Sequence, residues 1–295
     1  MDKIRPRRSV LYMPGTNARA LEKAKSLPAD ALIFDLEDAV APDAKEEART
    51  RVCEAAREGG YGNREVVIRV NGIASAWGKD DLQIAATAGA DAVCVPKVQS
   101  GAEVGAIRET LREAGAPPEL AIWAMIETPM GVLNVREIAA AAAADQNPLS
   151  VFVMGTNDLI KETRAGQTPD RLPMIASLSH CILAARAHGL DILDGVYNNF
   201  KDEEGFRRES IQGRDLGMDG KTLIHPGQIA IANETFSPDG EDTAWARKII
   251  AAFALPENRD KGVITLDGKM VELLHREMAL RTVAITDAIA ESSET

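Results

Sequence analysis

The sequence predicts an α/β fold in which eight parallel strands close into a (β/α)8 barrel. Short apolar runs recur along the chain, each run ends in polar residues or glycine, and stretches with helical periodicity separate the runs. The runs are apolar on both faces, which is typical of parallel strands covered by helices. They comprise residues 9–15 (SVLYMPG), 31–38 (ALIFDLED), 66–72 (VVIRVNG), 92–97 (AVCVPK), 121–129 (AIWAMIETP), 150–158 (SVFVMGTND), 191–198 (DILDGVYN) and 221–226 (KTLIHP).

The helices expected between these strands carry start and stop signals. Residues 16–26 open on Thr16 and Asn17, which favour a helix N-terminus. After Pro42 and Asp43, an acidic-first stretch runs to a glycine pair at 59–60, as the helix dipole and C-cap preferences favour. Further helices are expected at residues 77–90, 101–114, 132–144, 174–188 and 203–216.

The C-terminal segment has a different pattern. Residues 243–253 have the pattern of a helix, residues 263–272 that of a hairpin around the turn pair Asp267-Gly268, and residues 273–290 that of a final helix. A closed barrel has no edge strand for this hairpin to join. We therefore expect a barrel domain over residues 1–236 and an extension, residues 237–295, that packs over a barrel mouth, its own or that of a neighbouring subunit.

Composition and charge limit the classes of function. A length of 295 residues suits one barrel plus an extension. The net charge of −11 argues against nucleic acid or an anionic membrane surface as the main partner. No apolar stretch is long enough to span a membrane, and the N-terminus lacks the apolar region of a signal peptide, so we expect a cytoplasmic protein. Cys53, Cys94 and Cys181 fit neither a disulfide framework nor a zinc motif.

Two carboxylates end neighbouring strands of the expected barrel. Glu127 follows the fifth run and Asp158 the sixth, and catalytic groups of such barrels lie where strands end. Two converging carboxylates repel each other unless a cation or a proton lies between them. Oxygen ligands without a nearby His or Cys favour Mg²⁺, or Mn²⁺, over zinc. The alternative is that each carboxylate caps a following helix, but their position at adjacent strand ends favours a metal site.

Charged residues also end the second and third runs. Alternation points Asp35 and Glu37 to the same side, so one of them is expected to face the barrel and to bind metal-bound water or Arg69. Asp38 suits a helix N-cap. Arg69 lies in an otherwise apolar strand and needs a partner. A substrate carboxylate is one candidate, because the guanidinium matches it bidentately, and an ion pair with Glu37 is the other.

Other polar residues follow the remaining strands. Lys97 ends the fourth run, where it could contact substrate or a phosphate, or lie solvated at the rim. Gly155 and Thr156 supply backbone amides at a helix start, which suit an anion. His225 ends the eighth run and is either a base or a structural residue beside Pro226.

Together these motifs resemble a known family. RSVLYMPG, FDLEDAV, VIRVNG, VPKV, MIETP, GTNDL and GKTLIHPGQI occur in this order between residues 8 and 236. They resemble the citrate lyase β-subunit/malyl-CoA lyase family, the CoA-ester lyases of the HpcH/HpaI aldolase superfamily. The resemblance implies a TIM barrel, Mg²⁺, and a CoA thioester and a 2-oxo acid such as glyoxylate as small-molecule partners. It implies cleavage or formation of the C–C bond between the oxo acid and the acyl-CoA.

The resemblance also implies roles for individual residues. By position, Glu127 and Asp158 are similar to the family's metal ligands. Arg69 is similar to the residue that holds the oxo-acid carboxylate, and Glu37 and Asp38 to residues that support metal-bound water.

Further positions implied by the resemblance lie near both ends of the chain. Tyr12, Pro14 and Lys23 fall where relatives cradle CoA. Many relatives have an acid/base Asp in the C-terminal segment, often reaching the site of a neighbouring subunit, and Glu272 stands there in this chain. Many malyl-CoA lyases have Gly-Ser-Arg after the first strand, where this chain has Gly15-Thr16-Asn17.

The resemblance leaves alternative activities open. The ELLH and DGVYNNF segments are closer to the branch that includes malyl-CoA thioesterases, which hydrolyse (3S)-malyl-CoA to malate and CoA. Another alternative is a citryl lyase that acts on a carrier-bound substrate. Malyl-CoA, methylmalyl-CoA and citramalyl-CoA differ only by a methyl group, so the sequence does not choose among them. The expected assembly is a homotrimer or a hexamer.

Overall fold

Eight parallel strands form a closed barrel, which confirms the predicted fold. The computed structural model describes residues 4–143 and 148–293. The strands pair in chain order, and the first closes the barrel against the last. They are β1 (Ser9–Pro14), β2 (Ala31–Asp35), β3 (Glu65–Arg69), β4 (Ala92–Val95), β5 (Ala121–Ile126), β6 (Leu149–Met154), β7 (Asp191–Asp194) and β8 (Gly220–Leu223).

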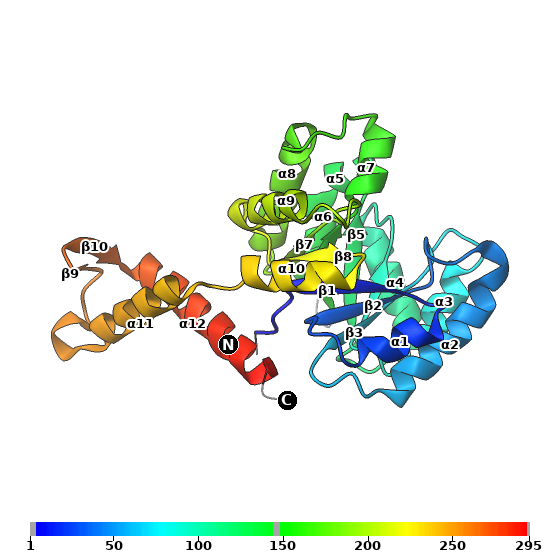
Figure 1. Cartoon of the computed structure of the whole chain (residues 1–295), viewed down its shortest axis with the longest axis horizontal. Coiled ribbons are helices and arrows are strands. Elements are labelled where there is room, and N and C mark those ends of the chain that lie inside the picture. Colours follow the sequence, from blue (N-terminus) through cyan, green and yellow to red (C-terminus); the bar gives the residue numbers. More distant parts are fainter. Residues whose placement is uncertain (1–3, 144–147, 294–295) are drawn as a thin grey trace. The chain divides into compact units, whose positions relative to one another are not determined.

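Helices surround these strands on the outside (Figure 1). Each lies at or near a predicted position, except α10, which was not predicted because its start, HPGQ, also reads as a strand end; for α7 only the start at Gly155 and Thr156 was predicted. They are α1 (Ala18–Ala24), α2 (Lys45–Glu58), α3 (Gly78–Ala85), α4 (Gly101–Glu113), α5 (Pro129–Leu133), α6 (Val135–Ala140), α7 (Thr156–Thr163), α8 (Ile175–Ala187), α9 (Glu203–Leu216) and α10 (Ile229–Thr235).

The single helix expected at residues 132–144 is wrong in two respects. Thr128 caps the N-terminus by accepting the backbone N–H of Gly131, so the helix α5 starts earlier, at Pro129. Asn134 then separates α5 from α6, and a 3₁₀ turn, Ala141–Ala143, follows. The expected end at residue 144 lies outside the described residues.

Strand alternation determines which side chains point into the barrel. Ile33, Val67, Trp123 and Met125 belong to a buried cluster that fills the interior, whereas alternate residues such as Phe34 pack with the surrounding helices. Successive side chains of a strand point to opposite faces. The residues two positions beyond Ile33, Val67 and Met125 are Asp35, Arg69 and Glu127. The same alternation that fills the interior therefore directs these three charged side chains to the inside of the barrel mouth.

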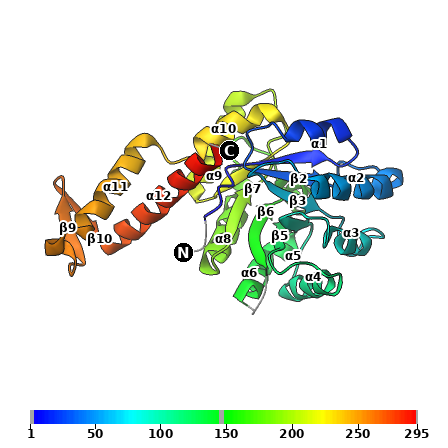
Figure 2. The ribbon, with the colours of Figure 1, turned by 90° about the horizontal axis from the view of Figure 1, so that it is seen from below.

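The chain divides into two compact units, residues 7–236 and a unit that contains residues 237–293 with residues 4–6. The second unit consists of α11 (Gly240–Ala254), β9 (Val263–Leu266), β10 (Lys269–Glu272) and α12 (Leu273–Ser293), which confirms the predicted helix, hairpin and helix. Asp267 and Gly268 both have positive φ, as the tight hairpin turn requires. Phe253, Ile264 and Val271 form part of a separate apolar core. The helices α11 and α12 lie side by side (Figure 2).

No helix in the described parts of the chain combines the length and the apolar character needed to cross a membrane.

Candidate active site

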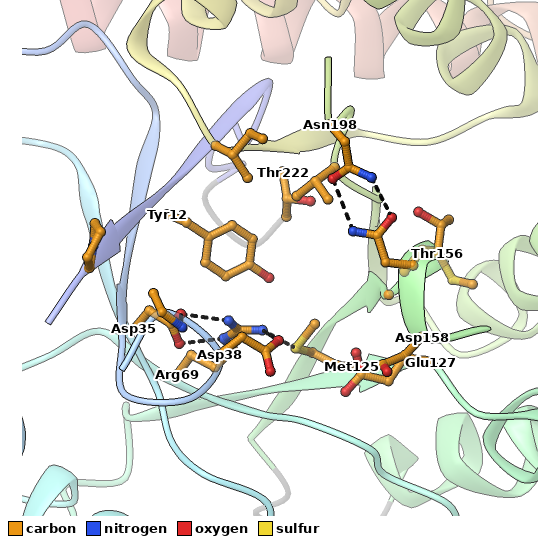
Figure 3. A pocket seen from close by; sticks show the side chains of 17 residues that line it. Tyr12, Asp35, Asp38, Arg69, Met125, Glu127, Thr156, Asp158, Asn198 and Thr222 are labelled. Carbon is orange, nitrogen blue, oxygen red and sulfur yellow. Dashed lines mark hydrogen bonds and ion pairs between the residues drawn. The ribbon is translucent and has the colours of Figure 1, made fainter. Parts of the chain in front are cut away.

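A pocket of about 380 Å³ opens at the carboxyl ends of the strands. Its lining comes from the ends of β1, β2, β3, β5, β6 and β8, so residues far apart in the sequence meet in one place. Figure 3 shows this pocket, with Asn198 and Thr156 at the upper right and the charged side chains below; these are Asp35, Asp38, Arg69, Glu127 and Asp158. Of the predicted residues, the lining contains Tyr12, Pro14, Asp38, Arg69, Glu127, Gly155, Thr156 and Asp158.

Arg69 is held mainly by Asp35. Its Nε and Nη2 each donate a hydrogen bond of 2.6 Å to one oxygen of the Asp35 carboxylate. Burial alone would raise the pKa of Asp35, but Arg69 and two backbone N–H donors hold that pKa below its ordinary value. The ring of Tyr12 stacks against the guanidinium, 4.7 Å from ring centroid to Cζ. Asp35 is therefore the barrel-facing carboxylate of the predicted pair.

Glu37 and Asp38 surround the remaining side of Arg69. The Nη1 atom lies 3.2 Å from Glu37 Oε2 and 3.3 Å from Asp38 Oδ2. The expected ion pair with Glu37 is thus present, but it is secondary to the bidentate pair. The alternative interpretation of Asp38 as a helix N-cap does not hold, because the next helical turn begins at Pro42 with Ala41 at its N-cap.

Glu127 and Asp158 flank the ammonium group of Lys97. The strands β5 and β6 are paired, as the prediction of neighbouring strand ends requires. Lys97 Nζ lies 3.7 Å from Glu127 Oε1 and 3.4 Å from Asp158 Oδ2. The same ammonium is 2.8 Å from Glu37 Oε1. Glu127 also accepts the backbone N–H of Lys97 at 2.8 Å.

Burial dominates the electrostatics of the two glutamates. The pKa of Glu127 is raised to about 7, because the effect of burial exceeds the opposite effect of the charge of Lys97. Burial likewise raises the pKa of Glu37, although Arg69 and Lys97 lower it. The Glu37 Oε2 atom is buried and accepts no hydrogen bond from the described residues. The raised pKa values of these two neighbouring carboxylates indicate that a further positive charge would stabilise their ionised form.

A glycine makes room for one of these carboxylates. A Cβ atom at Gly155 would lie 2.3 Å from both Cβ and Oε2 of Glu127, so no side chain fits there. Gly155 is also the N-cap of α7, for which no described side chain provides a cap. The first amides of a helix have no partner within the helix. The start of α7, at Thr156, therefore brings backbone donors to the pocket wall.

The far wall of the barrel is held by a buried ionic cluster that sequence reasoning missed. Lys221 and Asp194 are fully buried, and Lys221 Nζ donates to Asp194 Oδ2 at 2.9 Å and to Glu209 Oε1 at 2.8 Å. Arg171 Nη1 donates to both oxygens of Asp194, at 2.7 and 2.9 Å. The signal available in the sequence was a lysine within the apolar run GKTL, because such a lysine needs a buried partner.

Comparison with known proteins identifies the family. The family model of HpcH/HpaI aldolase/citrate lyase matches residues 8–226. The chain belongs to the HpcH/HpaI aldolase/citrate lyase family. It is 52% identical over 285 residues to the (3S)-malyl-CoA thioesterase of Cereibacter sphaeroides ATCC 17023, covering 97% of this chain and 96% of that protein. It is 35% identical to citrate lyase subunit beta of Escherichia coli K12, with 92% and 90% of the two chains covered.

Solved structures of the HpcH/HpaI family have the same architecture. The CitE protein of Mycobacterium tuberculosis, in complex with magnesium, acetoacetate and coenzyme A, matches with a TM-score of 0.72. The identity is 30%, and the match covers 93% of this chain and 97% of that one. A citrate lyase beta subunit of M. tuberculosis complexed with oxaloacetate and magnesium matches with a TM-score of 0.65 at 29% identity, over 81% of this chain and 100% of that one.

Three predicted residues of the barrel unit, Lys23, Glu37 and Lys97, are not part of this pocket's lining, and Glu272 belongs to the second unit. Lys23 is exposed on α1 and is not part of the pocket lining. Lys97 lines a neighbouring cavity, beside Glu37 and Trp77. Glu272 ends β10 in the second unit, where its backbone N–H donates to Nδ1 of His275.

His225 has a structural position. Its Nδ1 accepts the backbone N–H of Gly227 and caps the 3₁₀ turn Pro226–Gln228, while its ring stacks on Phe200 at 4.8 Å between centroids. This favours the structural interpretation over a catalytic base.

The pocket contains further polar residues that the sequence did not reveal. Asn157 and Asn198 exchange two side-chain hydrogen bonds, of 3.1 and 2.8 Å, across the pocket wall. Thr222 also lines the pocket. Polar residues at strand ends and in loops carry no periodic signal, so only the structure assigns them to the site.

Proposed function

We propose that this chain hydrolyses the thioester of a short hydroxy-dicarboxylic acyl-CoA of the (3S)-malyl-CoA type, giving malate and free CoA. The observation that carries this proposal is the 52% identity to (3S)-malyl-CoA thioesterases, which extends over nearly the whole of both chains. The pocket supports it, because an arginine, a cluster of carboxylates and helix-start amides meet there. We further propose that the pocket binds Mg²⁺ through Glu127 and Asp158.

The residues present fit a magnesium ion. Mg²⁺ prefers oxygen ligands and is held by one or two carboxylates with substrate and water oxygens. In the described part of the chain no three His, Cys, Asp or Glu side chains group closely enough to hold a metal alone. Two carboxylates completed by substrate oxygens agree with this. The Glu37 Oε2 atom, which accepts no hydrogen bond from the described residues, and the space that Gly155 leaves for Glu127 support the same assignment. When bound, the ion would polarise a substrate oxygen as a Lewis acid.

Arg69 and Tyr12 would position the substrate carboxylate. The guanidinium is fixed by Asp35, so its orientation is set before a ligand arrives. Burial raises the pKa of Tyr12 well above its ordinary value, although Arg69 lowers it. The phenol is therefore protonated at neutral pH, and its hydroxyl points into the pocket, where it can donate a hydrogen bond (Figure 3).

The thioester would react beside the start of α7. In hydrolysis, water attacks the thioester carbon, the C–S bond breaks, and CoA leaves as the thiol. The amides near Thr156 are suited to the negative charge that develops on the thioester oxygen. Pro14 at the pocket rim and Lys23 on α1 would contact the CoA moiety. Glu272 would position and deprotonate the attacking water.

Cleavage of the C–C bond is the second candidate activity. The family match and the 35% identity to citrate lyase beta subunits favour it. In that reaction the β-hydroxyacyl-CoA loses its hydroxyl proton and splits into a 2-oxo acid and the enolate of acetyl-CoA. Glu272 would then protonate the enolate carbon. Both activities would use the same pocket and metal, and they differ in which bond breaks.

Incubation of the purified chain with (3S)-malyl-CoA and Mg²⁺, followed by mass spectrometry, tests these proposals. We expect malate and free CoA, with no product after addition of EDTA. Acetyl-CoA with glyoxylate would instead establish the lyase activity. No turnover of either kind would contradict both and would favour the carrier-bound substrate of citrate lyase.

The extension would complete the active site from a neighbouring subunit. We propose a homotrimer or a hexamer, in which Glu272 reaches the mouth of an adjacent barrel. Mixing an inactive Arg69→Gln variant with an inactive Glu272→Gln variant tests this, after separation and reassembly of the subunits. Recovery of activity in the mixture is expected, because some sites then combine an intact Arg69 with an intact Glu272. Absence of recovery would indicate that Glu272 acts on the barrel of its own subunit.

A further inference from the structure

We propose that Lys97 competes with the divalent cation for Glu127 and Asp158 and thereby sets how tightly the site binds metal. This inference rests on the metal site of the proposed function and deepens it. It assigns to Lys97 a role other than the substrate or phosphate contact expected from the sequence.

The geometry places one ammonium group among three carboxylates from different parts of the barrel. Nζ of Lys97 lies 2.8 Å from Glu37, 3.4 Å from Asp158 and 3.7 Å from Glu127. These carboxylates come from the turn after β2, from α7 and from the end of β5. A simple surface ion pair would need only one of them. The convergence of three carboxylates indicates that this point of the site requires a positive charge.

The backbone of Lys97 is held in an unfavourable conformation that produces this arrangement. Its φ of +55° lies in the left-handed region, which residues other than glycine rarely adopt. Such a conformation persists only where the surroundings impose it. Here the backbone N–H donates to Glu127 Oε1 while the side chain of the same residue reaches Glu37 and Asp158. One residue therefore contacts Glu127 through both its backbone and its ammonium.

A metal ion and this ammonium would bind the same carboxylate oxygens of Glu127 and Asp158. A unit positive charge within 4 Å of two metal ligands repels a divalent cation and also occupies lone pairs that the cation needs. The Lys97 side chain has space to move, because it lines a neighbouring cavity of about 600 Å³ that also borders Glu37. On metal binding, Nζ is expected to keep its shortest contact, with Glu37, and to give up the other two.

Calorimetric titration of the full chain with Mn²⁺, at low ionic strength and without a CoA ester, tests the competition. We expect Lys97→Met to bind Mn²⁺ about tenfold tighter than the wild type, within the usual range of coupling between sites. Lys97→Arg keeps the charge and should bind like the wild type. Lys161→Met is the matched control, because Lys161 is exposed and, of the three carboxylates around Lys97, contacts Asp158, at 3.5 Å. It should change the affinity far less than Lys97→Met.

The outcomes separate this inference from the metal site itself. Equal or weaker binding by Lys97→Met, with normal binding by the wild type, overturns the competition and leaves the metal site intact. Failure of every variant and of the wild type to bind Mn²⁺ at millimolar concentration overturns both. Should Lys97→Met not fold, crystal structures of the wild type with and without Mg²⁺ decide the question. Nζ must leave the vicinity of Asp158 and Glu127 when the metal is bound, and an unchanged Nζ position contradicts the proposal.

Discussion

Asp35 and Arg69 are register partners on β2 and β3, and two hydrogen bonds of 2.6 Å join their side chains. Both side chains are buried, at 2% and 7% exposure. Because the pair spans two neighbouring strands, it fixes the guanidinium to the barrel wall. Removing one partner of a buried pair leaves an uncompensated charge, which is the expensive part of breaking it.

A double-mutant cycle on this pair should show strong coupling. We expect Asp35→Asn and Arg69→Gln each to lower the free energy of unfolding by about 3–5 kcal/mol. The double variant should lose clearly less than the sum, because neither charge is then left alone. Urea denaturation measures all three variants. The exposed pair Arg207–Glu234 is the control, for which we expect no measurable coupling. Additive losses for the buried pair would contradict the interpretation.

Loss of either proposed metal ligand should abolish both metal binding and turnover. Glu127→Gln and Asp158→Asn each remove a negative charge and an oxygen ligand, so we expect the heat of Mn²⁺ binding to disappear and the activity to fall by at least about 100-fold. EDTA should inactivate the wild type, and added Mg²⁺ should restore it. Asp215→Asn, on the exposed side of α9, controls for the change in net charge. Normal metal binding by both site variants would place the ion elsewhere.

The stability of the chain in EDTA should depend on pH through Glu127. The pKa of this carboxyl is raised from 4.5 to about 7 in the folded state, chiefly by burial. A raised pKa contributes stability that is fully present below pH 4.5 and is lost as the pH rises through about 7. Replacing Glu127 by Gln removes this loss.

Unfolding experiments on Glu127→Gln can measure this contribution. Relative to the wild type, the variant should gain up to about 3 kcal/mol between pH 4.5 and pH 8, from the 1.36 kcal/mol that each pKa unit represents. Glu162→Gln on the exposed side of α7 is the control and should show no such gain. A constant difference between Glu127→Gln and the wild type over this pH range would show that burial does not perturb the carboxyl.

Replacement of Lys221 should destabilise the barrel severely. Its ammonium is fully buried between Asp194 and Glu209, so Lys221→Met leaves these carboxylates with fewer positive partners. We expect a loss of about 3–5 kcal/mol in the free energy of unfolding. Lys201→Met, at an exposed position, should have no measurable effect. A wild-type unfolding transition for Lys221→Met would mean that Arg171 alone satisfies Asp194.

The sequence predicted the barrel well because burial on both faces makes each strand a uniform apolar run. It also predicted the meeting of Glu127, Asp158 and Arg69, since parallel strands end at the same edge and alternation directs side chains inward. The positive φ of Lys97 could not be predicted, because no local pattern requires it of a lysine. The place of Arg171 in the cluster around Asp194 was equally hidden, because it lies in a loop 23 residues away.

The closing seam of the barrel has a consequence for synthesis of the chain. Only three residue pairs join β1 to β8, and only two join β7 to β8. Ser9 pairs with Lys221, so the ladder between β1 and β8 cannot form until almost the whole barrel has left the ribosome. Until then the nascent sheet has two unpaired edges, to which another chain could add. Until the last strand emerges, these unpaired edges therefore expose the protein to aggregation.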